Sequence, residues 1–494
     1  MRGINDRERS EDPRAASSTT AEGAHSRAAL LTGASLLVLA ALVAPCVAQA
    51  ACSGANQTVS SSPSGTVFST GGAITVPAGK AVIAGTSAPG VNAYACSVTT
   101  LTNQGSINGG SAPAGADNTA PPGVGTSRAI TTLTNDGTIV GGAGPGTLER
   151  GGAGVANIFS PSSGTASITT LTNNGPIIGG QGEGSSSVGG TGLANANGSS
   201  IGSLDNSKGA TIGGGAGLGG PGLGGGGAGI GNEGEISKLS NEGTISGGMG
   251  PAGGFVSNVG LYNDLGTITT LTNSGAIVGG TATAAIFNYN GRITTATNSG
   301  AVTGGSGAPG EAGGAGLSNS FISRILSLTN AKGGVISGGN GGTGAAGGAG
   351  VANSATIGTL TNQGTIVGGA GGRSVTGGAG GTGVSNSRTI TTLTNTGAIT
   401  GGAGAEDGGE GGVGVANASG ATITTFDNAK GGVISGGAGG NGGGLAGNAF
   451  DNAGAITSFT NDGTIIENGL RLRYALDSTG SIGTLVNTGQ IVGD

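Results

Sequence analysis

Tryptophan is absent from this chain of 494 residues, aromatic residues make up only 2% of it, and charged residues only 9%. A core built on large aromatic side chains is therefore excluded, although such side chains dominate the buried area of many domains. The shortage of charge also argues against a disordered chain, which stays unfolded through high net charge and few β-branched residues. Glycine, in contrast, accounts for 118 residues, where about 7% is usual. These features favour a repetitive architecture over an ordinary globular one.

Side chains suited to catalysis or metal binding are also scarce. The only histidine is His25, and the densest acidic group is Glu233, Glu235 and Glu242, with Lys238 beside it. Sugar-cleaving β-helices need paired carboxylates on one face, and a solvated edge is the simpler interpretation of this group. The formal net charge of −6 argues against nucleic acid, which needs a basic surface. We expect no enzyme activity, no cofactor and no metal site.

A three-residue motif, L-x-N, recurs along most of the chain. Ten of its thirteen copies begin with leucine, and the other three begin with Ala296, Phe426 and Phe459. The copies are separated by 25 to 38 residues, and a period in this range is the signature of a repeat protein. The stretch 351–369, VANSATIGTLTNQGTIVGG, is a representative copy. In an extended backbone Leu360, Asn362, Gly364 and Ile366 lie on one side, because successive side chains alternate between faces.

Strands of three to five residues joined by tight turns predict an all-β fold, an elongated right-handed β-solenoid of about thirteen coils over residues 99–494. Each coil is one repeat, stacked on the previous coil about 4.8 Å away. The period-two pattern and the glycine content exclude a helix. Gly-rich segments of variable length are expected to leave the solenoid as loops at one corner.

Asparagine occupies the third position of the motif in every copy. At a bend its amide can bond to nearby backbone groups and to the asparagine of the next coil, which predicts a structural ladder. Ten copies continue with x-Gly, where glycine would permit the positive φ of a tight corner. The other three carry Lys208, Lys332 or Lys430, which we interpret as solvated turn residues. The predicted ladder consists of Asn103, Asn135, Asn173, Asn206, Asn241, Asn273, Asn298, Asn330, Asn362, Asn395, Asn428, Asn461 and Asn487.

The Gly-rich segments contain G-G-x-G strings, which also begin the calcium-binding nonapeptide repeat. The aspartate ligand of that repeat is missing almost everywhere. Only Glu406 and Asp407 come near the required position, as a single shifted instance. We therefore predict no calcium ladder.

The first 50 residues have the features of an export signal. A polar leader precedes an apolar run at 28–47, and the small-residue site Ala48–Gln49–Ala50 predicts cleavage after Ala50. An uncleaved membrane anchor is the alternative, since the run approaches the ~20 residues needed to span a bilayer. Cleavage would remove Cys46 and His25 with the leader.

Cys52 and Cys96 are then the cysteines that remain. An even pair in an oxidising compartment predicts one disulfide, which in the chain-entropy model stabilises the fold by about 4 kcal/mol. Between them lie the short β-favouring runs 67–69, 73–76 and 81–84, separated by Gly and Pro as in successive hairpin strands. We predict that residues 51–98 form an N-terminal cap on the open end of the solenoid.

The repeats of the form ITTLTNxGxIxGG, as at 130–142, 168–180, 268–280 and 390–402, resemble the passenger region of autotransporters, type V secreted surface proteins of proteobacteria. The resemblance covers about residues 99–494 and implies a β-helical surface or secreted passenger without a particular ligand. Such families end in a translocator barrel of alternating ~10-residue strands, and no such pattern follows Leu485. Membrane contact is therefore expected only through a barrel that this sequence does not contain.

The expected function is that of an exported, non-enzymatic surface or secreted protein with an adhesive role. Its partners would be a host or neighbouring-cell surface, extracellular matrix or a polysaccharide. One alternative is a ligand-binding solenoid such as an ice-binding protein, based on T-L-T pairs such as Thr132 with Thr134 and Thr392 with Thr394; Ser203 and Asp205 interrupt this pattern. A polysaccharide-acting β-helix is the other alternative.

Overall fold

The computed structural model describes residues 52–60, 65–113, 119–146, 149–160, 165–218, 224–250, 258–469 and 474–493. All of them belong to one compact unit, Val43–Asp494. The apolar run at 28–47 and the cleavage site after Ala50 lie outside the described residues. Within the described part of the chain, no helix is long and apolar enough to cross a membrane.

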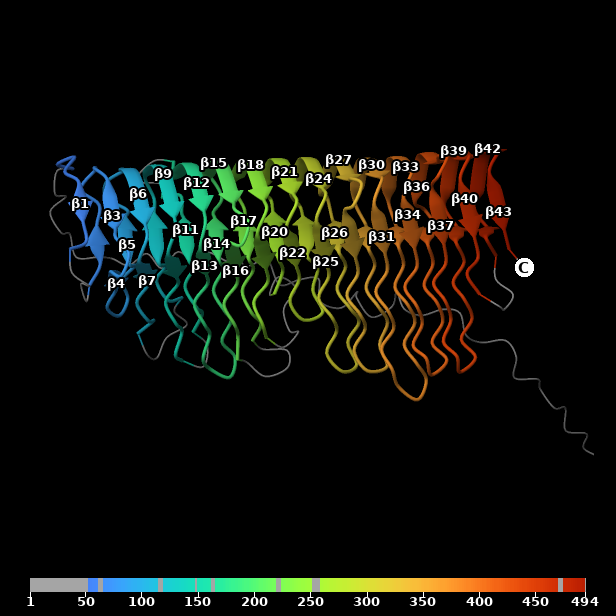
Figure 1. The fold of residues 1–494 in the computed structure, drawn as a ribbon, viewed down its shortest axis with the longest axis horizontal. Coiled ribbons are helices and arrows are strands. Elements are labelled where there is room, and N and C mark those ends of the chain that lie inside the picture. The colour runs from blue at the N-terminus through green and yellow to red at the C-terminus, as the bar shows by residue number, and fades with distance from the viewer. Residues whose placement is uncertain are drawn as a thin grey trace, which may run out of the picture. The chain divides into compact units, whose positions relative to one another are not determined.

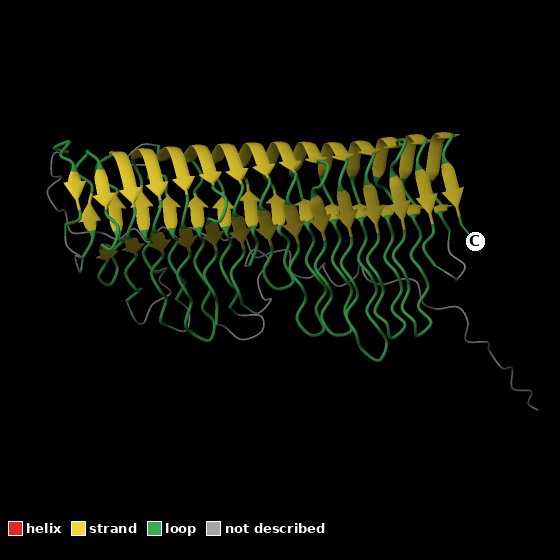
Figure 2. Ribbon diagram, viewed as in Figure 1, coloured by secondary structure: helices red, strands yellow, loops and turns green. Residues whose placement is uncertain are grey.

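The described residues form a β-solenoid in which each full coil adds one strand to each of three parallel sheets, in the chain order A, C, B (Figures 1 and 2). Sheet A has 15 strands: β1 (Gln57–Thr58), β3 (Ile74–Val76), β6 (Val98–Asn103), β9 (Ala129–Asn135), β12 (Ser167–Asn173), β15 (Ser200–Asn206), β18 (Glu235–Asn241), β21 (Thr267–Asn273), β24 (Arg292–Asn298), β27 (Arg324–Asn330), β30 (Thr356–Asn362), β33 (Thr389–Asn395), β36 (Thr422–Asn428), β39 (Ala455–Asn461) and β42 (Ser481–Asn487).

Sheets B and C have shorter strands. Sheet C has 14 strands: β4 (Ala81–Ile83), β7 (Ser106–Asn108), β10 (Thr138–Val140), β13 (Pro176–Ile178), β16 (Thr211–Gly213), β19 (Thr244–Ser246), β22 (Ala276–Val278), β25 (Ala301–Thr303), β28 (Val335–Ser337), β31 (Thr365–Val367), β34 (Ala398–Thr400), β37 (Val433–Ser435), β40 (Thr464–Ile466) and β43 (Gln490–Val492). Sheet B also has 14 strands: β2 (Val67–Phe68), β5 (Val91–Ala93), β8 (Val124–Thr126), β11 (Val155–Asn157), β14 (Leu193–Asn195), β17 (Ile230–Asn232), β20 (Leu261–Asp264), β23 (Ile286–Tyr289), β26 (Leu317–Ser320), β29 (Val351–Asn353), β32 (Val384–Asn386), β35 (Val415–Asn417), β38 (Phe450–Asn452) and β41 (Leu476–Ser478).

Equivalent residues of successive repeats stack directly on one another. Leu360, for example, pairs in register with Leu328 of the preceding coil and Leu393 of the following one. Leu360, Asn362 and Ile366 point inward and are buried, whereas Gly364 lies half-buried at the corner between sheets A and C. The predicted β-solenoid is confirmed.

One apolar cluster of Val, Ile, Leu, Ala and Phe side chains runs through the interior of the stack. Toward the C-terminal end, Phe426, Phe450 and Phe459 fill the interior, with ring centroids 4.6–5.2 Å apart. Ala296 takes the position that leucine occupies in the adjacent coils, and a small gap in the core opens between it, Leu271 and Leu328. A chain with few aromatic residues therefore builds its core mainly from aligned columns of aliphatic side chains.

The N-terminal strands differ from the prediction in their pairing. The expected runs are strands β2, β3 and β4, but each pairs in parallel with a later coil: β2 with β5, β3 with β6 and β4 with β7. The expected hairpins are therefore wrong. Residues 57–93 instead begin the same three sheets, and their position at the end of the stack is that of the predicted cap.

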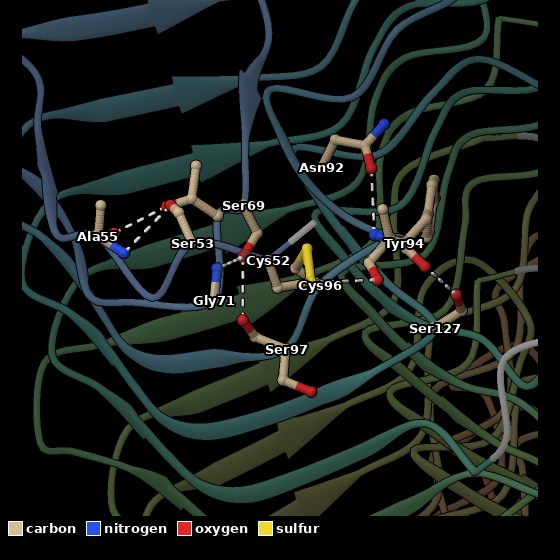
Figure 3. Close-up of a disulfide and its surroundings, with 12 residues drawn as sticks. Cys52, Ser53, Ala55, Ser69, Gly71, Asn92, Tyr94, Cys96, Ser97 and Ser127 are labelled. Carbon is tan, nitrogen blue, oxygen red and sulfur yellow. Dashed lines mark hydrogen bonds between the residues drawn. A yellow bond between two sulfur atoms is a disulfide. The ribbon is translucent and has the colours of Figure 1, made fainter. Parts of the chain in front are cut away.

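The disulfide between Cys52 and Cys96 is present, with 5.8 Å between the Cα atoms (Figure 3). Hydrogen bonds surround it: the Ser69 hydroxyl donates to the Ser97 carbonyl oxygen at 3.0 Å, and the Ser127 hydroxyl donates to the Tyr94 carbonyl oxygen at 3.2 Å. Burial raises the pKa of the Tyr94 hydroxyl to about 12. The bond thus fastens the first residues of the solenoid to the segment that precedes β6.

The Gly-rich segments between sheet C and sheet B form a fourth ordered element, which projects from one side of the sheets (Figure 2). We call it the glycine layer, and each segment in it has an outgoing arm and a returning arm. Its described residues lie within 141–154, 179–192, 214–229, 247–260, 279–285, 304–316, 338–350, 368–383, 401–414 and 436–449.

Backbone hydrogen bonds in the glycine layer repeat every three residues. The N–H groups of Gly338, Gly341 and Gly344 donate to carbonyl oxygens of the next coil, those of Val367, Ala370 and Arg373, with N···O distances of 2.9, 2.8 and 3.2 Å. Three residues per turn is the period of an extended helix of the polyproline II type. The segments lie at one corner, as predicted, and their hydrogen bonding is regular.

The outgoing and returning arms also alternate in a continuous series of hydrogen bonds. Gly348 N–H donates to the Gly339 carbonyl oxygen across its own coil, and Gly369 N–H of the next coil donates to the Gly348 carbonyl oxygen, both at 2.8 Å. The arms approach so closely that a Cβ on Gly369 would lie 1.9 Å from the Gly339 oxygen. Close approach of backbones therefore explains much of the chain's glycine content.

Candidate functional surface

The predicted asparagine ladder is formed inside the corner between sheets A and C. In each coil the side-chain Nδ2 donates to the Oδ1 of the equivalent asparagine in the next coil, at 2.7–2.9 Å, from Asn103 without a break to Asn487. The same Nδ2 also reaches a backbone oxygen of the next coil, as Asn362 does to Ala398 at 2.9 Å. The amides therefore connect successive corners.

A second ladder, which the L-x-N motif does not reveal, lines the corner between sheets B and A. Nine further amide-to-amide bonds of 2.7–2.8 Å join its members. They are the final asparagines of the V-x-N strands and their variants: Asn157, Asn195, Asn232, Asn263, Asn288, Asn319, Asn353, Asn386, Asn417 and Asn452. The recurrence of this second asparagine was the signal that could have found it.

In both ladders every side-chain Nδ2 donates toward the C-terminal end of the solenoid, so the hydrogen bonds of the two ladders run in the same direction. The first acceptor of each ladder, Oδ1 of Asn103 or of Asn157, is buried and has no hydrogen-bond partner. Val76 lies opposite Asn103, and Thr126 lies opposite Asn157. Thr126 instead donates its hydroxyl to backbone oxygens. Each ladder therefore begins where the preceding coil offers no amide.

The glycine two residues after the ladder asparagine has a different role from the predicted one. Gly137 and Gly364 are not in the positive-φ region; a Cβ on them would lie 2.0 and 2.2 Å from the carbonyl oxygen of the preceding coil. The expectation of positive φ at these glycines is therefore wrong, and close stacking is the reason for glycine. Positive φ occurs instead at Gly209, Gly333 and Gly431, in the three longer connections.

The outer face of sheet A carries two columns of side chains, polar at every position except Val486, which we call the hydroxyl columns. The first consists of Thr100, Thr132, Thr170, Ser203, Lys238, Thr270, Thr295, Ser327, Thr359, Thr392, Thr425, Ser458 and Thr484. The second consists of Thr102, Thr134, Thr172, Asp205, Ser240, Thr272, Thr297, Thr329, Thr361, Thr394, Asp427, Thr460 and Val486. In every coil but the last, the columns present a pair of hydrogen-bonding groups, and successive pairs are about 4.8 Å apart.

Charged residues interrupt the hydroxyl columns at two places. Lys238 and Asp205 form an ion pair of 3.1 Å between adjacent coils. Asp427 has no ion pair among the described residues, and burial followed by repulsion from Asp462 raises the pKa of its carboxyl group. Between these interruptions, both columns carry hydroxyl groups without a break from Thr270 and Thr272 to Thr392 and Thr394.

Replacing Asp427 by threonine is expected to stabilise the protein at neutral pH. The change removes the charge that burial and Asp462 disfavour, and it adds Thr–Thr neighbours worth about 0.5 kcal/mol. Because the folded-state pKa of Asp427 is raised, protonation relieves the penalty as the pH falls through that pKa. The difference in thermal midpoint should therefore be largest at neutral pH and shrink on acidification.

Asp205→Thr is the matched control for this change, because Asp205 already has Lys238 as a partner. It should show no comparable gain at neutral pH. An equal gain for both variants would contradict the proposed electrostatic origin.

The other sequence candidates do not form one site. Glu235 and Glu242 are exposed, while Lys238 is engaged with Asp205. Glu406 forms an exposed ion pair of 2.6 Å with Arg373. No group of three or more His, Cys, Asp or Glu side chains suited to a metal ion comes together in the described residues.

Lys208, Lys332 and Lys430 are exposed at the longer turns. Each stands immediately before a glycine with positive φ. This position agrees with their interpretation as solvated turn residues.

Glu233 lies near a group that the sequence did not connect with it. The Tyr262 hydroxyl donates to Oδ2 of Asp264 at 3.0 Å. Burial, and after it the charge of Asp264, raises the pKa of the Glu233 carboxyl group; burial also raises the pKa of Asp264, against the effect of hydrogen bonds from Tyr262 and Asn290. These carboxylates border a row of aromatic rings on the outer face of sheet B.

Comparison with protein-family models, curated proteins and solved structures finds no match for this chain. The fold therefore defines its class without a family. It is a β-solenoid repeat protein with three parallel sheets, two internal asparagine ladders and a glycine layer.

Proposed function

We propose that this is an exported, non-enzymatic surface or secreted repeat protein that adheres through its repeated outer face. The observation that carries the proposal is the pair of hydroxyl columns, which repeats hydroxyl groups in most coils of the stack and without a break from Thr270 and Thr272 to Thr392 and Thr394. Weak contacts repeated in this way add through multivalency without requiring a deep pocket. The partner would be a cell surface, extracellular matrix or a polysaccharide, and no cofactor is needed.

The location of the protein is part of this proposal. The leader at 1–50 and the resemblance of the repeats to autotransporter passengers support export to the cell surface or the medium. The disulfide between Cys52 and Cys96 suits an oxidising compartment. A passenger-type role would use the solenoid as a scaffold that holds its outer face away from the cell.

A repeated sequence in the chain allows the solenoid to be shortened without creating a new junction sequence. The sequence NAKGGVISGG occurs at both 330–339 and 428–437. Deleting 331–428 joins identical sequences and removes the three coils whose ladder asparagines are Asn362, Asn395 and Asn428.

Cells displaying the intact solenoid should adhere to a surface or to one another more strongly than cells displaying the shortened solenoid. The fractional loss of adhesion should exceed the fraction of coils removed, because multivalent contacts reinforce one another. Circular dichroism would show that both chains are folded, and surface labelling would show that both are displayed equally. Equal adhesion at equal display would contradict the multivalent proposal, as would turnover of a polysaccharide by the purified protein.

An ice-binding function is the second candidate. The observation in its favour is the unbroken stretch of both hydroxyl columns from Thr270 to Thr394, which spans five coils, two of which the same deletion removes. Arrest of ice growth by the purified intact chain, and weaker arrest by the shortened one, would favour this function over adhesion.

A further inference from the structure

One corner of the solenoid departs from the Gly, Ser and Thr surface of the other coils. It lies where sheet B turns into sheet A in four successive coils, and we call it the corner patch. Three of its apolar side chains are strongly exposed: Leu265 at 63%, Phe321 at 61% and Ile322 at 82%. Its members are Glu233, Glu235, Asp264, Leu265, Tyr289, Arg292, Phe321, Ile322 and Arg324.

A row of aromatic rings supports the corner patch from one side. Tyr262, Phe287, Tyr289 and Phe321 are in successive contact, with ring centroids 5.7, 5.7 and 4.4 Å apart. Tyr262 and Phe287 also pack on Ala228 and Val259, apart from the main core. Aromatic residues and arginine are enriched in protein interfaces. Only 2% of the chain is aromatic, yet four aromatic side chains gather at the corner patch.

The backbone at the corner patch is strained in the same place in three consecutive coils. Leu265, Asn290 and Phe321 have φ values of 58°, 53° and 65°, in the left-handed region that disfavours residues with a Cβ. The preceding strands β20, β23 and β26 have four residues, whereas other full coils have three in this sheet. Such strain costs about 1–3 kcal/mol per residue and clusters at functional sites. Here it accompanies the outward display of Leu265 and Phe321.

Charge is ordered along the corner patch. The first residue of the sheet A strand is Glu235, Thr267, Arg292 and then Arg324 in successive paired coils. Glu233 and Asp264 add negative charge at the same end as Glu235. None of these charged residues belongs to an ion pair formed among the described residues, and Arg292 and Arg324 are like charges in directly paired positions, an unfavourable arrangement within one chain.

We propose that the corner patch binds a second copy of this chain, in a two-fold symmetric dimer. A two-fold axis between the coils of β21 and β24 superposes the acidic end of one copy on the basic end of the other. Arg324 then faces Glu233 and Glu235 of the other copy, and Arg292 faces Asp264. A self-complementary order of charges is what an isologous interface requires.

The apolar residues fit the same arrangement. Phe321 and Ile322 of one copy come to lie over the coil of Gly234 in the other. Leu265 lies next to the axis, where the two copies approach most closely. The dimer would double the number of adhesive faces, although its formation does not depend on the adhesive function.

Charge reversal tests the dimer and its geometry together. The intact purified protein is expected to sediment as a dimer at about 10 μM. One variant, Arg324→Glu, and another, Glu233→Arg with Glu235→Arg, should each dimerise at least about tenfold more weakly, because like charges then meet at both ends. An equimolar mixture of the two variants should recover the dimer, since every facing pair in the heterodimer has opposite charges.

Lys332→Glu with Lys430→Glu is the matched control, as it reverses two exposed charges outside the corner patch and should leave the dimer unchanged. Circular dichroism of each variant would establish that it is folded. A native protein that remains monomeric at about 100 μM would overturn the proposal. So would a dimer that survives both reversals, or two folded variants that fail to associate when mixed.

Discussion

Replacing Gly369 by alanine is expected to destabilise the solenoid by about 3 kcal/mol, at the upper end of what overpacking usually costs. The new Cβ would lie 1.9 Å from the Gly339 carbonyl oxygen and 2.5 Å from its carbon, in the neighbouring coil. Those atoms are backbone held by hydrogen bonds on both sides, so no side-chain rotation can relieve the clash. The midpoint of urea denaturation, followed by circular dichroism, measures the loss.

Gly231→Ala is the matched control for this change. A Cβ on Gly231 would meet only the Thr191 Cγ2 at 3.5 Å, an ordinary contact, and its neighbours in sheet B are Ala194 and Tyr262. Alanine should be tolerated or mildly stabilising there, because glycine weakens the interior of a strand. Similar changes in stability for the two variants would contradict the close approach of backbones at Gly369.

Replacing Asn362 by alanine is expected to cost about 3 kcal/mol. Asn362 accepts from Asn330 at 2.9 Å and donates to Asn395 at 2.8 Å and to the Ala398 oxygen at 2.9 Å. The substitution leaves donors and acceptors buried without partners, each of which costs about 1–3 kcal/mol when it cannot reach water. The shift in the urea midpoint reports this cost.

Thr361→Ala, one residue earlier, is the control because Thr361 lies on the outer face of sheet A and is half-buried. It should change the stability little. Comparable losses at Thr361 and Asn362 would contradict the assigned inward and outward directions.

The sequence predicted those features that depend on residues at a fixed spacing. The L-x-N repeat indicated the coil, the direction of Leu360 and Asn362, and the ladder from Asn103 to Asn487. The short β-favouring runs between the cysteines predicted the strands near residues 67, 74 and 81, but not their partners. A short run broken by glycine looks the same locally whether it pairs with its neighbour in a hairpin or with a coil some 25 residues later.

Other features arise only when the coils are stacked. From the sequence alone, Gly364 could serve a corner with positive φ or a close approach of two backbones. The distance of 2.2 Å between a Cβ built on Gly364 and the Gly334 carbonyl oxygen shows that close approach is the reason. Tyr262 and Phe321 are 59 positions apart in the sequence, yet Phe287 and Tyr289 connect them in one row. The corner patch could not be recognised before the register was known.

The Gly-rich segments are an ordered part of the solenoid, and we expect them to help hold the outer face as a rigid array. Amide hydrogen exchange of the purified protein, resolved by mass spectrometry, tests this claim directly, because protected amides report hydrogen bonds that open rarely. We expect segments containing Gly339, Gly348 and Gly369 to be protected about as strongly as the adjacent strand β31. Exchange of those segments at the rate of an unstructured chain, while β31 remains protected, would contradict this expectation.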